Sequence, residues 1–536
     1  MTASASIRPY LNQAYLLGLL MMAVGLTLSP FLMGMSQFWL VIVWLVDACL
    51  TRSFKAKISR FWHNKAAVLL VAFYLMHVVG LLWTTDFQYA MKDLRVKLPI
   101  LVLPFILSGM EPLGRKRFSL VMLVYVLSVF VATLFSFAAY ARHDYGDVRE
   151  ISGFISHIRF CLNIVFCIAI IGHYLVSQKS PWWSKALQIV LQLWFVYQIF
   201  IFESLSGYVI LAAVVAVSAI YAFLRWQKGR GWRVALAIAT LTVFVVGSIV
   251  IVHKINPLLD VEVVDFDTLE SKTAQGNPYW HDTVYNPVED GKFVGLYYCE
   301  KEMREAWSRR SRLPFEGQTL NGESLEATLA RYLTSKDLRK DAEGVMALTD
   351  EDIRNVEQGV ANYNNWMHPG LRARLSVTLF EYNLYRRSGN PNGGSLSQRI
   401  EFTRAAFHIV RKHPLFGVGT GDVPTAFSQT YDEIQSPLSE EYRFRAHNQY
   451  LSVMIAFGIV GLALFLTMLF YPCLAKKTRS TYLYVTFLCI MLLSMLPEDT
   501  LETQAGASLF AFFESLLLFA VPQELETQKE KQPSKY

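Results

Sequence analysis

The chain contains repeated apolar runs that are long enough to cross a lipid bilayer, and this pattern constrains its fold more than any other feature. A run of about 18–22 residues forms a helix that covers a hydrocarbon core of roughly 30 Å. Hydrophobic residues make up 53% of the chain and charged residues only 17%, whereas soluble domains carry about 25% charged residues. A soluble fold would leave these helices uncovered. The sequence therefore predicts an all-α polytopic membrane protein.

The positions of these runs predict about twelve membrane helices. The first run follows Arg8 and leads directly into a second one, so it predicts a retained helix rather than a cleaved signal peptide. The fourth run is the shortest, and its helix is expected to extend backwards or to be tilted. The expected spans are residues 11–28, 33–50, 66–83, 97–108, 120–140, 155–176, 183–202, 207–224, 234–251, 449–469, 481–496 and 506–521.

Lysine and arginine are abundant in every second short loop between the expected spans and scarce in the loops between those. If the N-terminus is cytoplasmic, the cytoplasmic loops hold basic clusters, whereas the opposite loops hold few basic residues and one of them, 497–502, has only acidic charges. Cytoplasmic loops of membrane proteins are enriched in lysine and arginine. We therefore expect both termini in the cytoplasm and a large hydrophilic insert on the opposite face. The expected units are 1–253 with nine spans, the insert 254–446, 447–522 with three spans, and a tail, 523–536.

The insert is expected to be mainly helical. Residues 323–345, 350–358 and 396–412 have helical patterns, and a glycine-rich stretch, 416–421, follows them. That stretch is either a plain tight turn or a set of backbone N–H groups that faces an anion. Cys299 is the one cysteine of the insert, so no disulfide can form within it. The net charge of +7 follows from the membrane topology, and nothing indicates nucleic acid as a partner.

A basic cluster lies directly before the tenth expected span. It consists of Arg443, Arg445, His447 and Asn448. Cations at a helix N-terminus oppose the helix dipole, and positive charge is depleted on this outer face. Two interpretations remain: the basic side chains solvate the helix end and snorkel, or they bind an anionic lipid head group.

A second polar group opens the sixth expected span on the same face. His157 and Arg159 lie in its first turn. An ionisable residue just inside a span indicates a functional site unless it snorkels to the interface. Glu203, at the outer end of the seventh span, is a candidate base or a partner for an arginine. Arg399 and Arg404 lie on the last expected helix of the insert, where a solvated helix face is the alternative.

These residues resemble a motif of the O-antigen ligase and polymerase superfamily of bacterial inner-membrane glycosyltransferases. The family motif is His, then Asn, Ser or Gln, nine residues, Gly, two residues, and Gly, Thr or Tyr. In this sequence it reads His447–Asn448, nine residues, Gly458, two residues, Gly461. The preceding segment, 404–421, is similar to its counterpart in the family, and 499–506 is similar to the last outer loop of Bacteroidetes-type members.

The resemblance implies a GT-C-like membrane enzyme that transfers a glycan from undecaprenyl diphosphate to an acceptor hydroxyl. For a ligase the acceptor is lipid A-core, at the periplasmic face of the inner membrane. His447 would take the proton of the acceptor and Asn448 would fix its tautomer, while His157 and Glu203 would be accessory. No metal and no other cofactor is expected. Arginines would hold the leaving diphosphate, and the candidates are Arg159, Arg399, Arg404, Arg443 and Arg445.

One departure from the family concerns the eighth span. Many members open it with a Ser-Arg pair, but residues 203–207 read Glu-Ser-Leu-Ser-Gly and contain no arginine. Either Arg159 or an arginine of the insert would then take its role, or the donor is held differently. Within the superfamily, a polymerase that uses a growing glycan and a protein O-glycosyltransferase are the alternatives. A transporter would need inverted repeats and charges at the midplane, and the sequence has neither.

Overall fold

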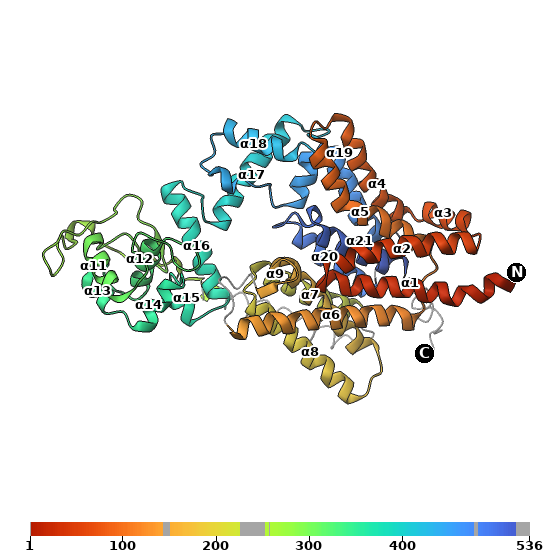
Figure 1. Cartoon of the computed structure of the whole chain (residues 1–536), viewed down its shortest axis with the longest axis horizontal. Helices are drawn as coiled ribbons and strands as arrows, with labels where there is room; N and C mark the ends of the chain where they lie inside the picture. The colour runs from red at the N-terminus through yellow and green to blue at the C-terminus, as the bar shows by residue number, and fades with distance from the viewer. Residues whose placement is uncertain are drawn as a thin grey trace.

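Helices account for most of the structure. The computed structural model describes residues 2–142, 151–225, 252–475 except 254 and 257, and 481–520. Within these ranges the one sheet is a short antiparallel pair, β1 (Val288–Glu289) and β2 (Lys292–Phe293). Figure 1 shows the long helices gathered on one side of the molecule and most of the insert on the other. This arrangement agrees with the predicted all-α fold.

Eight described helices are long and apolar enough to cross a membrane. Each of them coincides with a predicted span. They are α1 (Thr2–Leu28), α2 (Pro30–Leu50), α4 (Lys65–Val79) continued by η1 (Gly80–Trp83), α6 (Arg115–Arg142), α7 (His157–Ser177), α8 (Trp182–Ile201), α9 (Leu205–Arg225) and α19 (Gln449–Leu474).

The other four predicted spans have different outcomes. The span predicted at 97–108 is the second half of a longer helix, α5 (Phe87–Gly109), whose first half is charged. The last two predicted spans coincide with shorter apolar helices, α20 (Tyr482–Ser494) and α21 (Gln504–Phe519). The span predicted at 234–251 lies entirely outside the described residues. The total of twelve therefore stays a prediction.

The outer surface of α8 explains why these helices need lipid. Its residues Leu187, Val190 and Leu193 are 62%, 62% and 64% exposed, and the helix buries only four of its side chains. In water, a contiguous apolar surface of this kind promotes association. Against lipid tails it carries no such cost. The chain is a multi-pass membrane protein.

The insert is built in two parts. The distal part has its own core, which we call the distal core, and the helices α11 (Glu300–Arg310), α12 (Leu325–Ser335), α13 (Ala342–Met346), α14 (Asp350–Glu357) and α15 (Tyr363–Met367) surround it. The single helix expected over 323–345 is in fact two helices, because the chain turns between them and Asp337 adopts a positive φ of 60°. The distal core consists of Met303, Ala306, Trp307, Phe315, Leu325, Leu329, Tyr332, Leu333, Val345, Leu348, Ile353 and Val356.

The proximal part of the insert shares its core with the membrane helices. Its helices are α16 (Leu371–Ser388), α17 (Ser395–Lys412) and α18 (Val423–Glu433). Phe402 of α17 and Phe427 of α18 belong to the same hydrophobic cluster as the membrane helices. Figure 1 shows α17 and α18 beside α19, with α16 leading to the distal helices. The remaining elements are α3 (Phe54–His63), η3 (Phe266–Thr268), η4 (Glu440–Tyr442) and η6 (Thr500–Glu502).

A capping box at Asp352 makes the distal part sensitive to acid. Its carboxylate accepts hydrogen bonds from Lys336 (2.7 Å), Tyr332 (2.6 Å) and the Thr349 backbone (2.9 Å). Burial raises the pKa of Asp352, but these donors outweigh it and lower the pKa from 3.8 to about 2. A lowered pKa means stability that is present above about pH 4 and lost as the pH falls toward about 2, worth about 2 kcal/mol.

We expect Asp352→Asn to destabilise the distal part by about 2 kcal/mol at pH 7 and by about half of that at pH 3. Thermal unfolding of the full chain in detergent, followed by tryptophan fluorescence, measures this, since Trp307 is fully buried in the distal core. The control is Glu351→Gln, because Glu351 is the exposed neighbour on the same helix. Equal destabilisation by Asp352→Asn at both pH values would contradict the prediction.

The insert is joined to α19 at Gly458, the first glycine of the sequence motif. Gly458 has a φ of 61° inside α19, and the helix unwinds there. The Ile455 and Ala456 carbonyls, released from their own helix, accept hydrogen bonds of 2.9 Å from the N–H groups of Val418 and Gly419. In return, Ile459 and Val460 donate to the carbonyls of 414 and 415. A stretch of the insert thus supplies the backbone bonds that the kink removes, which lipid cannot do.

Gly458→Ala is expected to destabilise the protein by on the order of 3 kcal/mol. A Cβ at this position would lie 2.2 Å from the backbone of Leu415, and the positive φ disfavours alanine. The loss of folded protein on heating in detergent measures the effect. Gly34→Ala is the matched control, since its Cβ would meet no atom closer than 3.9 Å. If both variants melt like the parent, the close approach is not required.

Candidate active site

His447 lies in a strained backbone conformation directly before α19. Its φ is 46°, a left-handed conformation that few residues other than glycine adopt. Its ring packs 5.6 Å from that of Phe402 and 6.4 Å from that of Phe444. Backbone strain of this kind is found preferentially at functional sites. The Nδ1 atom is buried and makes no hydrogen bond within the described part of the chain.

Asn448 caps the first turn of α19. Its Oδ1 accepts a hydrogen bond of 3.0 Å from the N–H of Leu451, and its Nδ2 donates one of 2.8 Å to the carbonyl of Leu496. An asparagine at this position satisfies backbone groups that a helix end leaves open. Asn448 therefore fixes the start of the helix, and with it the residue that precedes the helix.

Glu498 faces His447 from the loop between α20 and α21. Its Oε2 lies 3.9 Å from His447 Nδ1, and its Oε1 accepts a hydrogen bond of 3.0 Å from Arg399. Burial raises the pKa of Glu498, but His447, Arg399 and Arg159 outweigh this effect, so the pKa lies below its usual value. Glu498 is therefore a carboxylate at neutral pH.

Asp499 faces His447 in the same way. Its Oδ1 lies 3.8 Å from His447 Nδ1, and its Oδ2 lies 3.2 Å from Arg445. Burial raises the pKa of Asp499, and Arg445 only partly offsets this because Glu502 and Glu498 add negative charge nearby. The Nδ1 edge of the imidazole thus faces two carboxyl groups, each of which is paired with an arginine on its other side.

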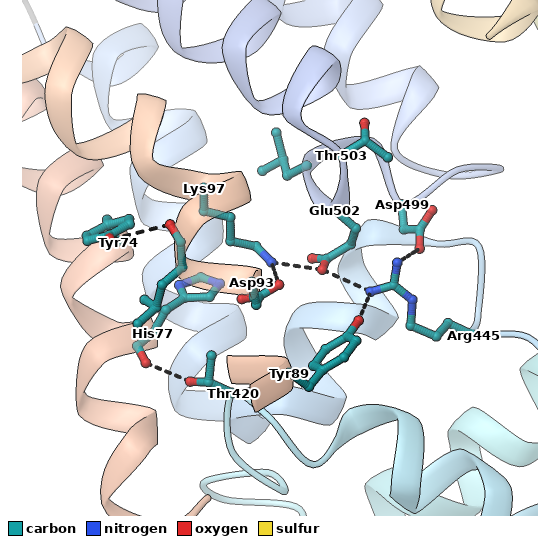
Figure 2. A network of polar contacts seen from close by, with 12 residues as sticks. Tyr74, His77, Tyr89, Asp93, Lys97, Thr420, Arg445, Asp499, Glu502 and Thr503 are labelled. Atoms are coloured by element: carbon teal, nitrogen blue, oxygen red, sulfur yellow. Dashed lines mark hydrogen bonds and ion pairs between the residues drawn. The ribbon is translucent and has the colours of Figure 1, made fainter. Parts of the chain in front are cut away.

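Arg445 is fully engaged with protein groups. Its Nη1 donates to Tyr89 (2.9 Å) and to Glu502 (3.1 Å), and its Nη2 pairs with Asp499. Figure 2 shows this guanidinium between the two carboxylates. Burial lowers the pKa of Arg445, but the surrounding acidic groups outweigh it, so the pKa is raised. This cation is held by the protein rather than left open for a ligand.

One buried donor of Arg159 is not used by the described residues. Arg159 lies in the first turn of α7, half-buried, and its Nε is buried without a hydrogen-bond partner among the described residues. It is close enough to Glu498 and Asp499 to interact with both electrostatically. A guanidinium with a free donor near the strained His447 suits an anionic ligand.

The other predicted site residues have different surroundings. Arg404 is mostly exposed and lies 3.8 Å from Glu401, and Arg443 pairs with Asp432 at 2.7 Å. These two carboxylates lie on α17 and α18, and Arg443 also donates to the carbonyl of Leu438 (3.2 Å). His157 is the first residue of α7. Glu203 Oε1 accepts a hydrogen bond of 2.5 Å from the N–H of Gly370, before α16.

His447, Glu498 and Asp499 also form a group that a metal ion could join. One ligand atom of each lies within 4.8 Å of the others. Both carboxylates, however, already pair with an arginine, at 3.0 and 3.2 Å. A divalent cation would have to displace these guanidinium groups or lie beside them. The charge arrangement therefore favours a proton or a neutral hydroxyl at the imidazole, and the expected absence of a metal stays a prediction.

Sequence analysis did not identify the carboxylates of the site. The acidic charge of the loop 497–502 indicates topology, and the resemblance of 499–506 to a family loop assigns no role to its carboxylates. The missing signal was that this loop lies on the same expected face as the basic cluster before α19. Opposite charges on one face of a membrane protein pair readily where little water competes.

A comparison with known protein families gives a match that overlaps the candidate site. Residues 358–466 match the sequence model of the family described as O-Antigen ligase. The matched residues are about a fifth of the chain and include α16 to α18, His447, Asn448 and the kink at Gly458. No curated protein matches the chain. The match identifies an O-antigen ligase domain at residues 358–466 and supports membership of the chain in the O-antigen ligase superfamily.

Proposed function

We propose that the protein transfers a glycan from undecaprenyl diphosphate to a hydroxyl of lipid A-core at the periplasmic face of the bacterial inner membrane. The observation that carries this proposal is the strained His447, with two carboxylates on its Nδ1 edge and Arg159 nearby. Family membership supports lipid-linked glycans and acceptors as the general substrates. The basic residues of the loops support the topology.

His447 acts on the acceptor in this proposal. Glu498 and Asp499 face Nδ1, so the proton of the neutral imidazole is favoured on Nδ1 and Nε2 is left as the base. Nε2 takes the proton of the acceptor hydroxyl while that oxygen bonds to C1 of the glycan. The two carboxylates then stabilise the imidazolium.

Arg159 acts on the leaving group. The bond between C1 and the phosphate oxygen breaks, and negative charge develops on undecaprenyl diphosphate. A guanidinium can stabilise this charge through paired N–H donors. Arg399 and Arg445 hold the carboxylates beside His447, so they act on the donor less directly. The bond to the diphosphate supplies the driving force, and no nucleotide is consumed.

The test uses the purified full-length chain in lipid nanodiscs with undecaprenyl-diphosphate-linked glycan. Lipid A-core, a second glycan-lipid and a Ser/Thr peptide are offered separately, and gel mobility reports the product. We expect lipid A-core to be extended, with or without EDTA. Extension of the glycan-lipid alone would indicate a polymerase, and extension of the peptide a protein glycosyltransferase. If no acceptor is extended, the proposed transfer is wrong.

A further inference from the structure

Lys97 is a buried lysine in α5 and lies between two carboxylates. Its side chain is 2% exposed. It pairs with Asp93, one turn earlier in α5, and with Glu502 Oε2 of the last outer loop at 2.8 Å. We call Asp93, Lys97 and Glu502 the inner charge cluster. Figure 2 shows this cluster next to Arg445 and Asp499.

Glu502 is shared between Lys97 and the candidate active site. The same oxygen, Oε2, also accepts a hydrogen bond of 3.1 Å from Arg445. The other oxygen accepts one of 3.1 Å from Gln449, whose own oxygen accepts from the N–H of Leu501 at 2.7 Å. The charges therefore alternate in sign from Asp93 through Lys97, Glu502 and Arg445 to Asp499, and Asp499 faces His447.

Stability alone does not account for a buried group of this kind. Removing charges from water costs several kcal/mol for each ion, and well-packed neutral side chains are often as stable or more stable. Ionisable residues among membrane helices accordingly tend to have a function. No hydrogen bond or ion pair joins the inner charge cluster to His447 in the described residues. The charged route from the cluster toward His447 runs through Arg445 and Asp499.

We infer that Lys97 is a positioning residue for the transfer reaction, because it shares Glu502 and so leaves Arg445 free to bridge Glu502 and Asp499. Without Lys97, Glu502 would have Arg445 as its only cationic partner and would draw it away from Asp499. A cavity of about 20 Å³, about the size of one water molecule, lies beside Lys97, Arg445 and Glu502. The carboxylate that faces His447 would then lose its arginine. This inference rests on the proposed function.

The experiment compares the parent with Asp93→Asn/Lys97→Met, which removes one positive and one negative charge and leaves the local net charge unchanged. We expect kcat for glycan transfer to fall about tenfold or more, with little change in the KM for the donor. Lys97→Arg, which keeps the charge, should retain most of the rate. If Asp93→Asn/Lys97→Met does not accumulate, Asp93→Asn/Lys97→Gln removes the same charges and keeps polar side chains.

A second background separates positioning from packing. In a Glu502→Gln protein, Lys97 and Arg445 no longer share a carboxylate at position 502. Adding Asp93→Asn/Lys97→Met to this protein should therefore lower kcat no further. A role in packing alone would reduce kcat equally in both backgrounds, and that result would overturn the inference. An unchanged kcat in the parent background would overturn it as well.

The chain offers a matched control pair at the other end of α5. Lys57 is also buried and pairs with Asp47 at 2.5 Å, and it lies near Gly109, the last residue of α5. Asp47→Asn/Lys57→Met removes an equivalent pair far from His447 and should leave kcat unchanged. An inactive parent would refute the proposed function, whereas an active parent with an unaffected Asp93→Asn/Lys97→Met variant refutes only the role of Lys97.

Discussion

Replacing His447 by alanine is expected to lower glycan transfer by about 10²- to 10⁴-fold while the protein still binds the lipid donor. The reason is that a positioned base takes the proton of the acceptor only in the transition state. Transfer is measured with the purified chain in nanodiscs, and donor binding is measured separately with a labelled lipid diphosphate.

The positive φ of His447 calls for a second substitution. Asparagine adopts this conformation more readily than alanine does, and its amide cannot take up a proton at neutral pH. His447→Asn should therefore be as inactive as His447→Ala, without the added strain. His408→Ala is the control, since His408 is a partly exposed histidine of α17 that pairs with Glu433. Parental activity in His447→Asn would exclude a base at this position.

Arg159→Ala is expected to lower transfer by roughly 30- to 1000-fold, equivalent to about 2–4 kcal/mol of transition-state stabilisation. The expectation follows from its free Nε donor and from the engagement of Arg445 and Arg399 with carboxylates. Initial rates over a range of donor concentrations measure the loss. Arg159→Lys should recover part of the activity, because lysine has the charge but not the planar pair of donors.

Arg411→Ala provides the comparison for Arg159→Ala. Arg411 is an exposed arginine near the end of α17, and its removal changes the net charge by the same amount. It should leave the rate unchanged. If Arg159→Ala is as active as Arg411→Ala, another group must stabilise the diphosphate, and the insert arginines would be the next to examine.

The membrane helices could be predicted from the sequence because their signal is local. Each of the eight helices that are long and apolar enough to cross a membrane carries its own apolar run. The start of α5 could not be located for the same reason, since Asp93 and Lys97 break its apolar pattern. Their pairing with each other and with Glu502 cannot be seen in a window of residues. Hydropathy detects charges but not their partners.

The candidate site was predictable only in part. His447 and Arg159 stood out because positive charge is unusual at those positions. The carboxylates Glu498 and Asp499 did not, because they come from a loop about 50 residues after His447 and meet it only through the packing of α19 to α21. The glycine-rich stretch 416–421, for which a tight turn and an anion site were both open, instead packs against the kink of α19.

The kink at Gly458 has a consequence for how the enzyme can change its partners. Four backbone hydrogen bonds join the stretch from 414 to 419 to the unwound turn of α19, the helix that follows His447. Backbone bonds do not depend on side-chain identity, so substitutions elsewhere in the insert leave this attachment intact. The distal core, which packs separately, can therefore change in sequence without displacing His447.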